Sequence, residues 1–310
     1  MELSRLMLLL INLKYFVESY KTVVCVHGLN NDEADFAPMV PHIKKAHPGT
    51  DVVNLHYSPG RFTLDPITVQ LEWFNKAIDH VLNNTSDNIQ LICHSQLKGL
   101  KQKGGVVCMG YLMLTKNHRV DNFVVLSSPI FGQYGLTGDI LNDIPALRPF
   151  KDLAAEAITE LVYTPLLQNS LSIANYWRDP RPSTKEAYEK VAVYLPLIHN
   201  DPQYHLYNET EAIQRKANFL DLKNLVLFGG PTDEIIKPWQ SPLFGYFDED
   251  PLSGHVVNMT DQKIYKEDWI GLQALHKTGR LHSYVVPGLY HEDWVNSESF
   301  FMNYVAQWLT

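Results

Sequence analysis

The sequence predicts a doubly wound α/β domain, in which a mostly parallel sheet lies between two layers of helices. Apolar runs near residues 23–26, 88–93 and 122–127 are rich in Val, Ile and Leu, as in strands that are buried on both faces. Segments of helical periodicity separate these runs along the chain. The length of 310 residues, with 45% hydrophobic and 19% charged side chains, is sufficient for a large core and a deep pocket.

The first half of the chain alternates between expected strands and expected helices. Pro66 opens the clearest helix, because Pro is favoured at helix starts and the apolar residues after it repeat every three or four positions. The other expected elements are a strand at 23–26, a helix around 36–46, a strand at 51–56, a strand at 88–93, a glycine-led helix at 104–114 and a strand at 122–127. This order predicts parallel strands joined by crossover helices.

The second half begins with a segment that breaks the alternation. From about residue 130 to 220, helical pieces mix with prolines and many aromatic residues, which indicates an inserted helical cap. Strand signals return at 224–228 and 281–286, and a last helix carries Phe300, Tyr304, Val305 and Trp308 on one face. We therefore expect a single domain over 20–310, with its cap inserted at about 130–220.

The composition excludes several classes of function. There are 26 basic and 34 acidic side chains, a net charge of −8, and no basic stripe, so binding to nucleic acid is not expected. The hydrophobic content is too high for a disordered scaffold. Cys25, Cys93 and Cys108 lie among apolar neighbours without metal-ligand or CxxC spacing, so we expect three buried free thiols and neither a metal nor another cofactor.

Residues 1–19 resemble a short signal peptide. Arg5 precedes an almost wholly apolar run from Leu6 to Leu13, and Val17-Glu18-Ser19 has small residues at the spacing for cleavage after Ser19. The alternative is an amino-terminal helix packed on the domain. Because the run is far shorter than the ~20 residues that span a bilayer, no permanent membrane anchor is expected.

Candidate glycosylation sites agree with entry into the secretory route. Four N-x-[ST] sequons begin at Asn83, Asn84, Asn208 and Asn258. Together with the leader they predict a protein of the lysosome or the cell exterior. The sequence does not predict an oligomeric state.

Three residues with catalytic chemistry follow expected strands. Ser95 lies at a strand-to-helix turn, where a strained turn exposes the hydroxyl and the helix start offers N–H donors. Asp233 and His291 each follow a later strand. The order Ser, Asp, His is that of the α/β-hydrolase fold, so we expect Ser95, Asp233 and His291 to form a catalytic triad.

Other residues compete for two of these roles. Glu234 is a rival acid beside Asp233, while His276 and His282 are rival bases that lie before or inside the last strand. The oxyanion hole is expected from the N–H groups of Leu29 and Gln96, which follow the first strand and the nucleophile.

Several blocks of sequence resemble the palmitoyl-protein thioesterases, and among these the lysosomal type. The blocks are Val26-His27-Gly28-Leu29, His47-Pro48-Gly49-Thr50, Leu91-Ile92-Cys93-His94-Ser95-Gln96, Leu126-Ser127-Ser128-Pro129 with Gly132-Gln133-Tyr134-Gly135, Asn175-Tyr176-Trp177-Arg178-Asp179-Pro180, and Gly229-Gly230-Pro231-Thr232-Asp233 with Pro238-Trp239-Gln240-Ser241. The resemblance covers roughly Tyr20 to Thr310. It implies a glycosylated lysosomal enzyme that cleaves fatty-acyl thioesters, with Ser95, Asp233 and His291 matching the family triad.

One segment departs from the family pattern. The family continues from its nucleophile as Ser-Gln-Gly-Gly, whereas residues 97–103 stand here between Gln96 and Gly104-Gly105. We expect these seven residues to loop out, because glycines disfavour a continuous helix. The Gln96 N–H would then no longer be fixed by the helix start. The sequence therefore predicts a folded but severely impaired thioesterase, with a carboxylic ester lipase and a non-catalytic acyl-binding relative as the alternatives.

Overall fold

The computed structural model describes residues 20–26, 36–57, 65–94, 104–135 and 153–310. Its centre is a six-stranded sheet in the order β2-β1-β3-β4-β5-β8, in which each neighbouring pair is parallel. The strands are β1 (Val23–Val26), β2 (Val52–Asn54), β3 (Ile89–His94), β4 (Val120–Leu126), β5 (Asn224–Gly229) and β8 (Leu281–Val285). A separate antiparallel pair consists of β6 (Tyr246–Phe247) and β7 (Val256–Val257).

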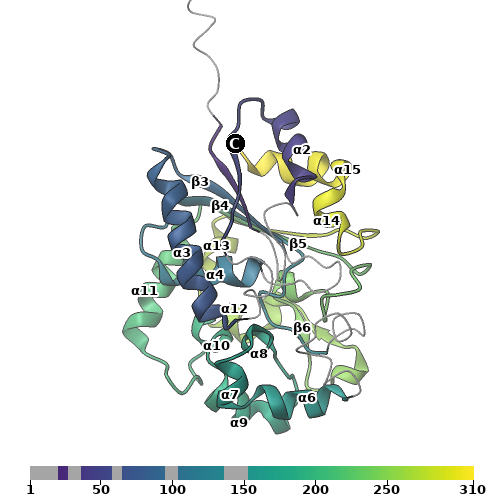
Figure 1. Cartoon of the computed structure of the whole chain (residues 1–310). Coiled ribbons are helices and arrows are strands. Elements are labelled where there is room, and N and C mark those ends of the chain that lie inside the picture. The colour runs from purple at the N-terminus through teal and green to yellow at the C-terminus, as the bar shows by residue number, and fades with distance from the viewer. Residues whose placement is uncertain (1–19, 27–35, 58–64, 95–103, 136–152) are drawn as a thin grey trace, which may run out of the picture.

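Successive strand residues bury on opposite faces of the sheet, which is why the central strands are apolar throughout. In β1, Val24 and Val26 belong to one hydrophobic cluster, whereas Val23 and Cys25 belong to the other. The cluster with Val24 and Val26 includes apolar residues of α3 (Ile67–Asn83) and α4 (Gly104–Leu114), while the other includes residues of α2 (Met39–Ala46) and α14 (Asp293–Asn296). Helices therefore cover both faces of the sheet (Figure 1).

Between β4 and β5 the chain forms a group of mostly short helices (Figure 1). They are α6 (Ala155–Val162), α7 (Pro165–Gln168), α8 (Ser172–Tyr176), α9 (Pro182–Val191), α10 (Leu195–Ile198) and α11 (Glu209–Leu220). After β5 the described part of the chain also forms α12 (Lys263–Lys266), α13 (Leu272–Lys277) and α15 (Glu298–Phe300). Short 3₁₀ helices lie at Ser241–Leu243, Pro251–Ser253 and Met259–Asp261, and the chain ends with a π-helical turn at Phe301–Val305 and a 3₁₀ turn at Ala306–Trp308.

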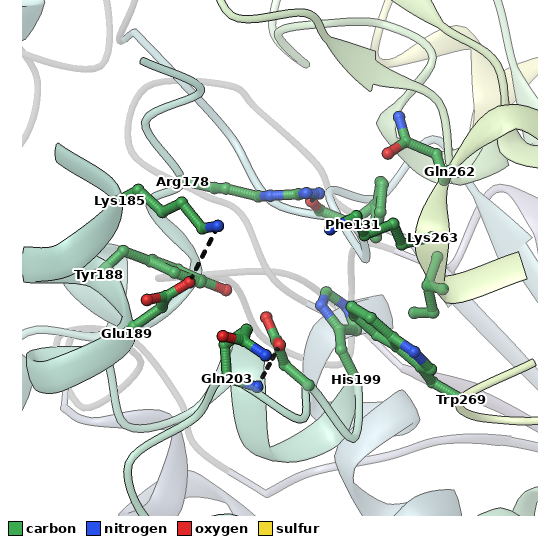
Figure 2. Close-up of a pocket in the computed structure, with 12 residues that line it drawn as sticks. Phe131, Arg178, Lys185, Tyr188, Glu189, His199, Gln203, Gln262, Lys263 and Trp269 are labelled. Atoms are coloured by element: carbon green, nitrogen blue, oxygen red, sulfur yellow. Dashed lines mark hydrogen bonds and ion pairs between the residues drawn. The ribbon is translucent and has the colours of Figure 1, made fainter. Parts of the chain in front are cut away.

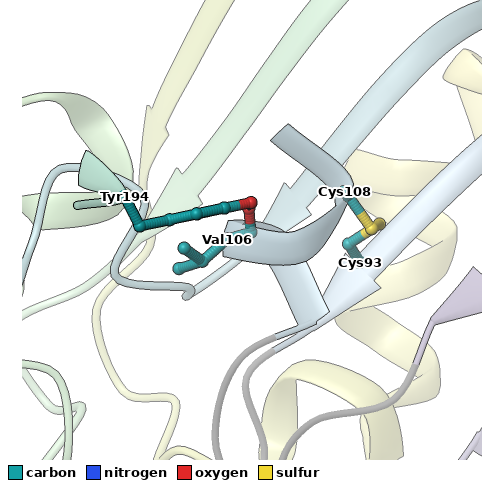
Figure 3. The surroundings of a disulfide bond; sticks show 4 residues. All are labelled: Cys93, Val106, Cys108 and Tyr194. Carbon is teal, nitrogen blue, oxygen red and sulfur yellow. A yellow bond between two sulfur atoms is a disulfide. The ribbon is translucent and has the colours of Figure 1, made fainter. Parts of the chain in front are cut away.

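Tyr194 joins this helical group to α4. Its hydroxyl donates to the backbone carbonyl of Val106 at 3.0 Å (Figure 3). A Cβ added to Gly110 would lie 1.8 Å from the Tyr194 hydroxyl oxygen, so α4 needs a glycine at this position. The buried tyrosine thus holds the α10 segment directly against a helix of the central domain.

The structure confirms the fold class expected from the sequence: a mostly parallel sheet with helices on both faces. The main differences are at the ends of elements, since β2 is shorter than the expected strand and the last helix is divided into α, π and 3₁₀ turns. None of the helices in the described ranges is long and apolar enough to cross a membrane. The leader expected at residues 1–19 lies outside the described residues.

The prediction of three free thiols was wrong. Cys93 and Cys108 form a disulfide, with their Cα atoms 6.7 Å apart, while Cys25 is a buried free thiol (Figure 3). Cys93 precedes the last residue of β3 and Cys108 lies within α4. Their pairing depends on how closely α4 packs against β3, which the spacing of the two cysteines in the sequence does not reveal.

Candidate active site

Asp233 and His291 lie beyond the carboxyl ends of two neighbouring strands, β5 and β8. The two turns approach each other closely, since a Cβ added to Gly230 would lie 2.1 Å from the carbonyl oxygen of Val286. The glycine therefore allows the two chain segments to run side by side. As a result Nδ1 of the His291 ring lies 2.7 Å from Oδ2 of Asp233, and the structure brings together these two predicted site residues.

The Asp233 carboxylate is surrounded by hydrogen-bond donors. Its Oδ2 accepts from the Ser127 hydroxyl at 2.5 Å and from the Trp294 indole N–H at 3.1 Å, in addition to His291. Its Oδ1 accepts from the backbone N–H groups of Ile235 at 2.9 Å and Ile236 at 3.1 Å. Every partner donates, which is the environment of an ionised carboxylate.

The balance of burial and charge agrees with this geometry. Burial alone would raise the pKa of Asp233, but the charge of the neighbouring His291 and the hydrogen bonds from His291, Ser127 and Ile236 outweigh it and lower the pKa to about 2. Asp233 is therefore ionised at any pH above about 3. An ionised carboxylate can only accept, so the Nδ1 atom of His291 carries the hydrogen of this bond.

The other ring nitrogen of His291 is free for chemistry. The side chain of His291 is fully buried, and its Nε2 atom has no hydrogen-bond partner among the described residues. The backbone N–H of His291 donates to the Glu234 carboxylate at 3.1 Å. Because Nδ1 carries a hydrogen, neutral His291 presents the Nε2 lone pair as a base.

A second imidazole lies beside His291. His94, the last residue of β3, is fully buried, and its ring centroid is 5.0 Å from that of His291. Its Nε2 atom lies 3.2 Å from the backbone carbonyl oxygen of His291. Burial lowers the pKa of His94 well below its usual value and the proximity of His291 lowers it further, although Asp233 and the hydrogen bond to the His291 backbone act in the opposite direction. His94 is therefore a neutral neighbour that donates to the His291 backbone.

The rival residues do not occupy the corresponding positions. Glu234 is exposed and accepts from the backbone of His291, not from its ring. His276 hydrogen-bonds the Tyr265 hydroxyl at 2.6 Å, and His282 lies within β8 opposite Val226. Neither of these rings is hydrogen-bonded to Asp233.

Ser95, Leu29 and Gln96, the expected nucleophile and oxyanion donors, lie outside the described residues, as does the segment 97–103. The sequence also did not single out Ser127 and Trp294 as partners of Asp233. Ser127 was visible only as part of a family block, and its backbone φ of 37° is a left-handed conformation that is strained for a serine. No group of three or more His, Cys, Asp or Glu that could hold a metal occurs in the described part of the chain.

Comparison with known proteins identifies the family. The family model for palmitoyl protein thioesterase matches residues 22–291. The chain belongs to the palmitoyl protein thioesterase family. It is therefore an enzyme of the thioester hydrolase class, and the resemblance seen in the sequence blocks is confirmed.

Relatives of this thioesterase are similar over nearly their whole length. Lysosomal thioesterase PPT2-B of Xenopus laevis is 38% identical over 293 residues, which cover 94% of this chain and 93% of the relative. Lysosomal thioesterase PPT2 of Homo sapiens is 33% identical over 292 residues, covering 94% and 89%. Among solved structures, the mature Bacillus licheniformis lipase BlEst2 is 12% identical with a TM-score of 0.48, a likeness too low to bear on function.

Proposed function

We propose that this thioesterase is a lysosomal enzyme that cleaves fatty-acyl thioesters, of the palmitoyl-CoA or S-acyl type, through an acyl-enzyme on Ser95. His291 is the general base and Asp233 holds its imidazole. The observation that carries the proposal is the buried Asp233–His291 hydrogen bond of 2.7 Å, which leaves the Nε2 atom of His291 unpartnered among the described residues. Ser95 directly follows His94 in the chain, and the His94 ring lies beside that of His291.

The proposed reaction begins with a proton transfer. Nε2 of His291 takes the proton of the Ser95 hydroxyl as the oxygen attacks the thioester carbonyl carbon, and ionised Asp233 stabilises the imidazolium that forms. The N–H group of Leu29 stabilises the oxyanion, and the N–H group of Gln96 is the second donor, which residues 97–103 keep from being fixed by the helix start. The thiolate then leaves, which needs little acid help because thiols have pKa values near ~8.5. The departed thiolate takes the proton from the His291 imidazolium, which makes His291 a base again. His291 then deprotonates a water that attacks the acyl carbonyl, and it gives this proton to the Ser95 oxygen as the fatty acid leaves.

The cellular setting is proposed from the leader, the sequons and the relatives. Both vertebrate relatives described above are named lysosomal thioesterases. We infer a signal peptide at residues 1–19 and glycosylation on the surface. Exposure of all four sequon asparagines supports this inference: Asn83, Asn84, Asn208 and Asn258. A mature chain that begins near Tyr20 and shifts in mass on glycosidase treatment would support it, whereas an unprocessed, unglycosylated chain would contradict it.

The decisive experiment is labelling with a fluorophosphonate, followed by intact-mass analysis. We expect one adduct per chain, located on Ser95 by peptide mapping and absent from Ser95→Ala. His291→Gln should slow labelling, because the base would be lost. An adduct that persists in Ser95→Ala would show that another residue is the nucleophile.

Two other functions remain as alternatives to be tested. A carboxylic ester lipase would hydrolyse palmitoyl oxygen esters as well as matched thioesters. A non-catalytic acyl-binding relative would bind palmitoyl-CoA without turnover and without forming the adduct, which is the expectation if residues 97–103 disable the nucleophile turn. Comparing the hydrolysis rates of matched oxygen esters and thioesters distinguishes a lipase from a thioesterase. Formation of the Ser95 adduct distinguishes either enzyme from a non-catalytic acyl-binding protein.

A further inference from the structure

A charged cleft lies outside the Asp233–His291 pair. Its volume is about 300 Å³, and its walls come from the loop after β4, from α9, from the segment after α10 and from α12. A second cleft of about 280 Å³ adjoins it and shares Arg178, Lys185, Tyr188, Glu189, Asp201 and Gln262 with it. Figure 2 shows the Arg178 side chain reaching across the first cleft, between the side chains of α9 and Gln262.

Arg178 is held rigidly where the two clefts meet. Its guanidinium carbon lies 4.1 Å from the ring centroid of Phe131 and 4.5 Å from that of Tyr246, and one N–H donates to the Phe131 carbonyl at 3.2 Å. Arg178 is half-buried and has no ion-pair partner among the described residues. A guanidinium fixed in this way loses little conformational entropy when its remaining N–H groups bind an anion.

The other charges of the cleft partly compensate one another. Lys185 and Glu189 form an ion pair at 3.5 Å along α9. Lys263 has no ion pair in the described part of the chain, and Asp201 accepts the backbone N–H of Gln203 at 2.9 Å. Burial raises the pKa of Asp201. With three basic and two acidic side chains, the first cleft alone carries an excess of positive charge in a chain whose net charge is −8. The second cleft adds Arg181 against Asp179, Asp248 and Glu249, so we place the anion in the first cleft, beside Arg178 and Lys263.

The cleft is within reach of the proposed reaction centre. Phe131 follows Ser127, the hydrogen-bond partner of Asp233, by four residues, which span at most ~14 Å when fully extended. A flexible arm attached to a thioester sulfur could therefore place its far end in the cleft. An alkyl chain is a poor occupant, because it would desolvate several charged side chains without replacing their hydrogen bonds.

We propose that this cleft binds an anionic group, a carboxylate or a phosphate, carried by the thiol moiety of the substrate, with Arg178 as the main contact and Lys263 as a second one. The inference rests on the proposed thioesterase function, and it names which half of the substrate the cleft recognises. Arg178 would bind the anion through two parallel N–H···O bonds, and Lys263 would act as a point charge.

The test measures binding of the free thiol products, so it does not depend on turnover. Calorimetric titration compares coenzyme A, which carries phosphates, glutathione, which carries carboxylates, and uncharged N-acetylcysteamine. We expect Arg178→Met to weaken the binding of at least one anionic thiol ~10-fold or more, the loss of one charge-assisted contact, without changing that of N-acetylcysteamine. Which anionic thiol is affected decides between phosphate and carboxylate. Lys45→Met, which removes a cation from an exposed ion pair with Glu298, is the matched control and should leave all three affinities unchanged.

Two outcomes would overturn the proposal: no loss for either anionic thiol, or an equal loss for all three. If Arg178→Met does not fold, as judged by thermal unfolding, the exposed Lys263→Met replaces it, and unchanged affinities would again overturn the proposal. Anion binding without a Ser95 adduct would instead refute the proposed catalytic function and leave the cleft assignment intact. A Ser95 adduct without anion binding would refute the cleft assignment and leave the proposed catalytic function intact.

Discussion

The imidazole rings of His94 and His291 are both fully buried and their centroids lie 5.0 Å apart, with Nε2 of His94 facing the His291 carbonyl oxygen at 3.2 Å. The contact joins the last residue of β3 to the turn after β8, at the edge of the sheet where Asp233 also lies. Because the pKa of His94 is lowered by burial, the ring stays neutral and its N–H remains available as a donor. His94 is therefore a positioning residue for His291.

The first prediction follows from this contact. His94→Leu removes the donor and frees the His291 backbone, so kcat should fall by up to ~10²-fold while KM changes little, since misplacement of a catalytic group by about 1 Å costs that much. His94→Gln can place an amide N–H near the same carbonyl and should retain most of the rate. Steady-state kinetics on a palmitoyl thioester checks both variants. If His94→Leu and His94→Gln lowered kcat equally, the hydrogen bond from His94 would not be what positions His291.

The second prediction concerns Asp233. Asp233→Asn removes the charge that stabilises the imidazolium, and kcat should fall ~10³–10⁴-fold. Asparagine has nearly the same shape as aspartate, so it is a better probe than alanine, which would also open a cavity. Glu234→Gln is the matched control, because Glu234 is exposed and its carboxylate accepts a hydrogen bond from the His291 backbone, not from its ring. A larger loss in Glu234→Gln than in Asp233→Asn would make Glu234 the acid of the site.

Asp233 also predicts a dependence of stability on pH. Its folded pKa of about 2 lies below the ordinary value of 3.8, so its ionised form stabilises the fold by on the order of 2 kcal/mol above pH ~4. This contribution is lost as pH falls through 3.8 toward 2, where the protonated acid resembles asparagine. The difference in unfolding free energy between the wild type and Asp233→Asn should therefore narrow from pH 5 to pH 2. Urea unfolding of both proteins at several pH values measures this difference. If the difference in unfolding free energy stayed constant from pH 5 to pH 2, the lowered pKa of Asp233 would be contradicted.

The fourth prediction concerns the disulfide. Cys93 and Cys108 are separated by 15 residues in sequence, so the cross-link should stabilise the fold by about 3 kcal/mol through its effect on the unfolded chain. The Cys93→Ala/Cys108→Ala variant should lose this amount and should no longer respond to reductant. Cys25→Ala, which removes a buried thiol outside the disulfide, should keep the response to reductant. Denaturant unfolding with and without reductant distinguishes the two.

The sequence could predict the sheet because the period and composition of each strand are local properties. Val23–Val26 and Gly104–Leu114 were predicted with the bounds that the structure has. Asp233 and His291 could be placed at strand ends for the same reason. The donors from Ser127 and Trp294 could not be predicted, because they reach Asp233 across 106 and 61 residues of chain. The cleft at Arg178 likewise combines segments that are far apart in the sequence, from Phe131 to Trp269.

The last prediction concerns residues 97–103, which separate Gln96 from Gly104-Gly105. α4 already lies close to the site, since a Cβ added to Gly105 would meet the Ser128 hydroxyl oxygen at 2.4 Å, and the Cys93–Cys108 disulfide ties α4 to the end of β3. A variant without 97–103 restores the family order Ser-Gln-Gly-Gly between two segments that the cross-link already holds together. It would also allow the start of α4 to fix the Gln96 N–H as an oxyanion donor.

Since the loss of one oxyanion donor lowers rates ~10²–10³-fold, deleting 97–103 should raise turnover of palmitoyl-CoA by at least that factor. Fluorophosphonate labelling of Ser95 should accelerate in parallel, and the disulfide should persist in the deletion variant, as mass analysis under non-reducing conditions can show. Replacing 97–103 by a glycine–serine segment of equal length is the matched control, and it should remain slow because the donor would still be unfixed. If the natural chain and the deletion variant hydrolyse palmitoyl-CoA equally fast, the inserted residues are compatible with a formed oxyanion hole and the argument from the nucleophile turn is wrong.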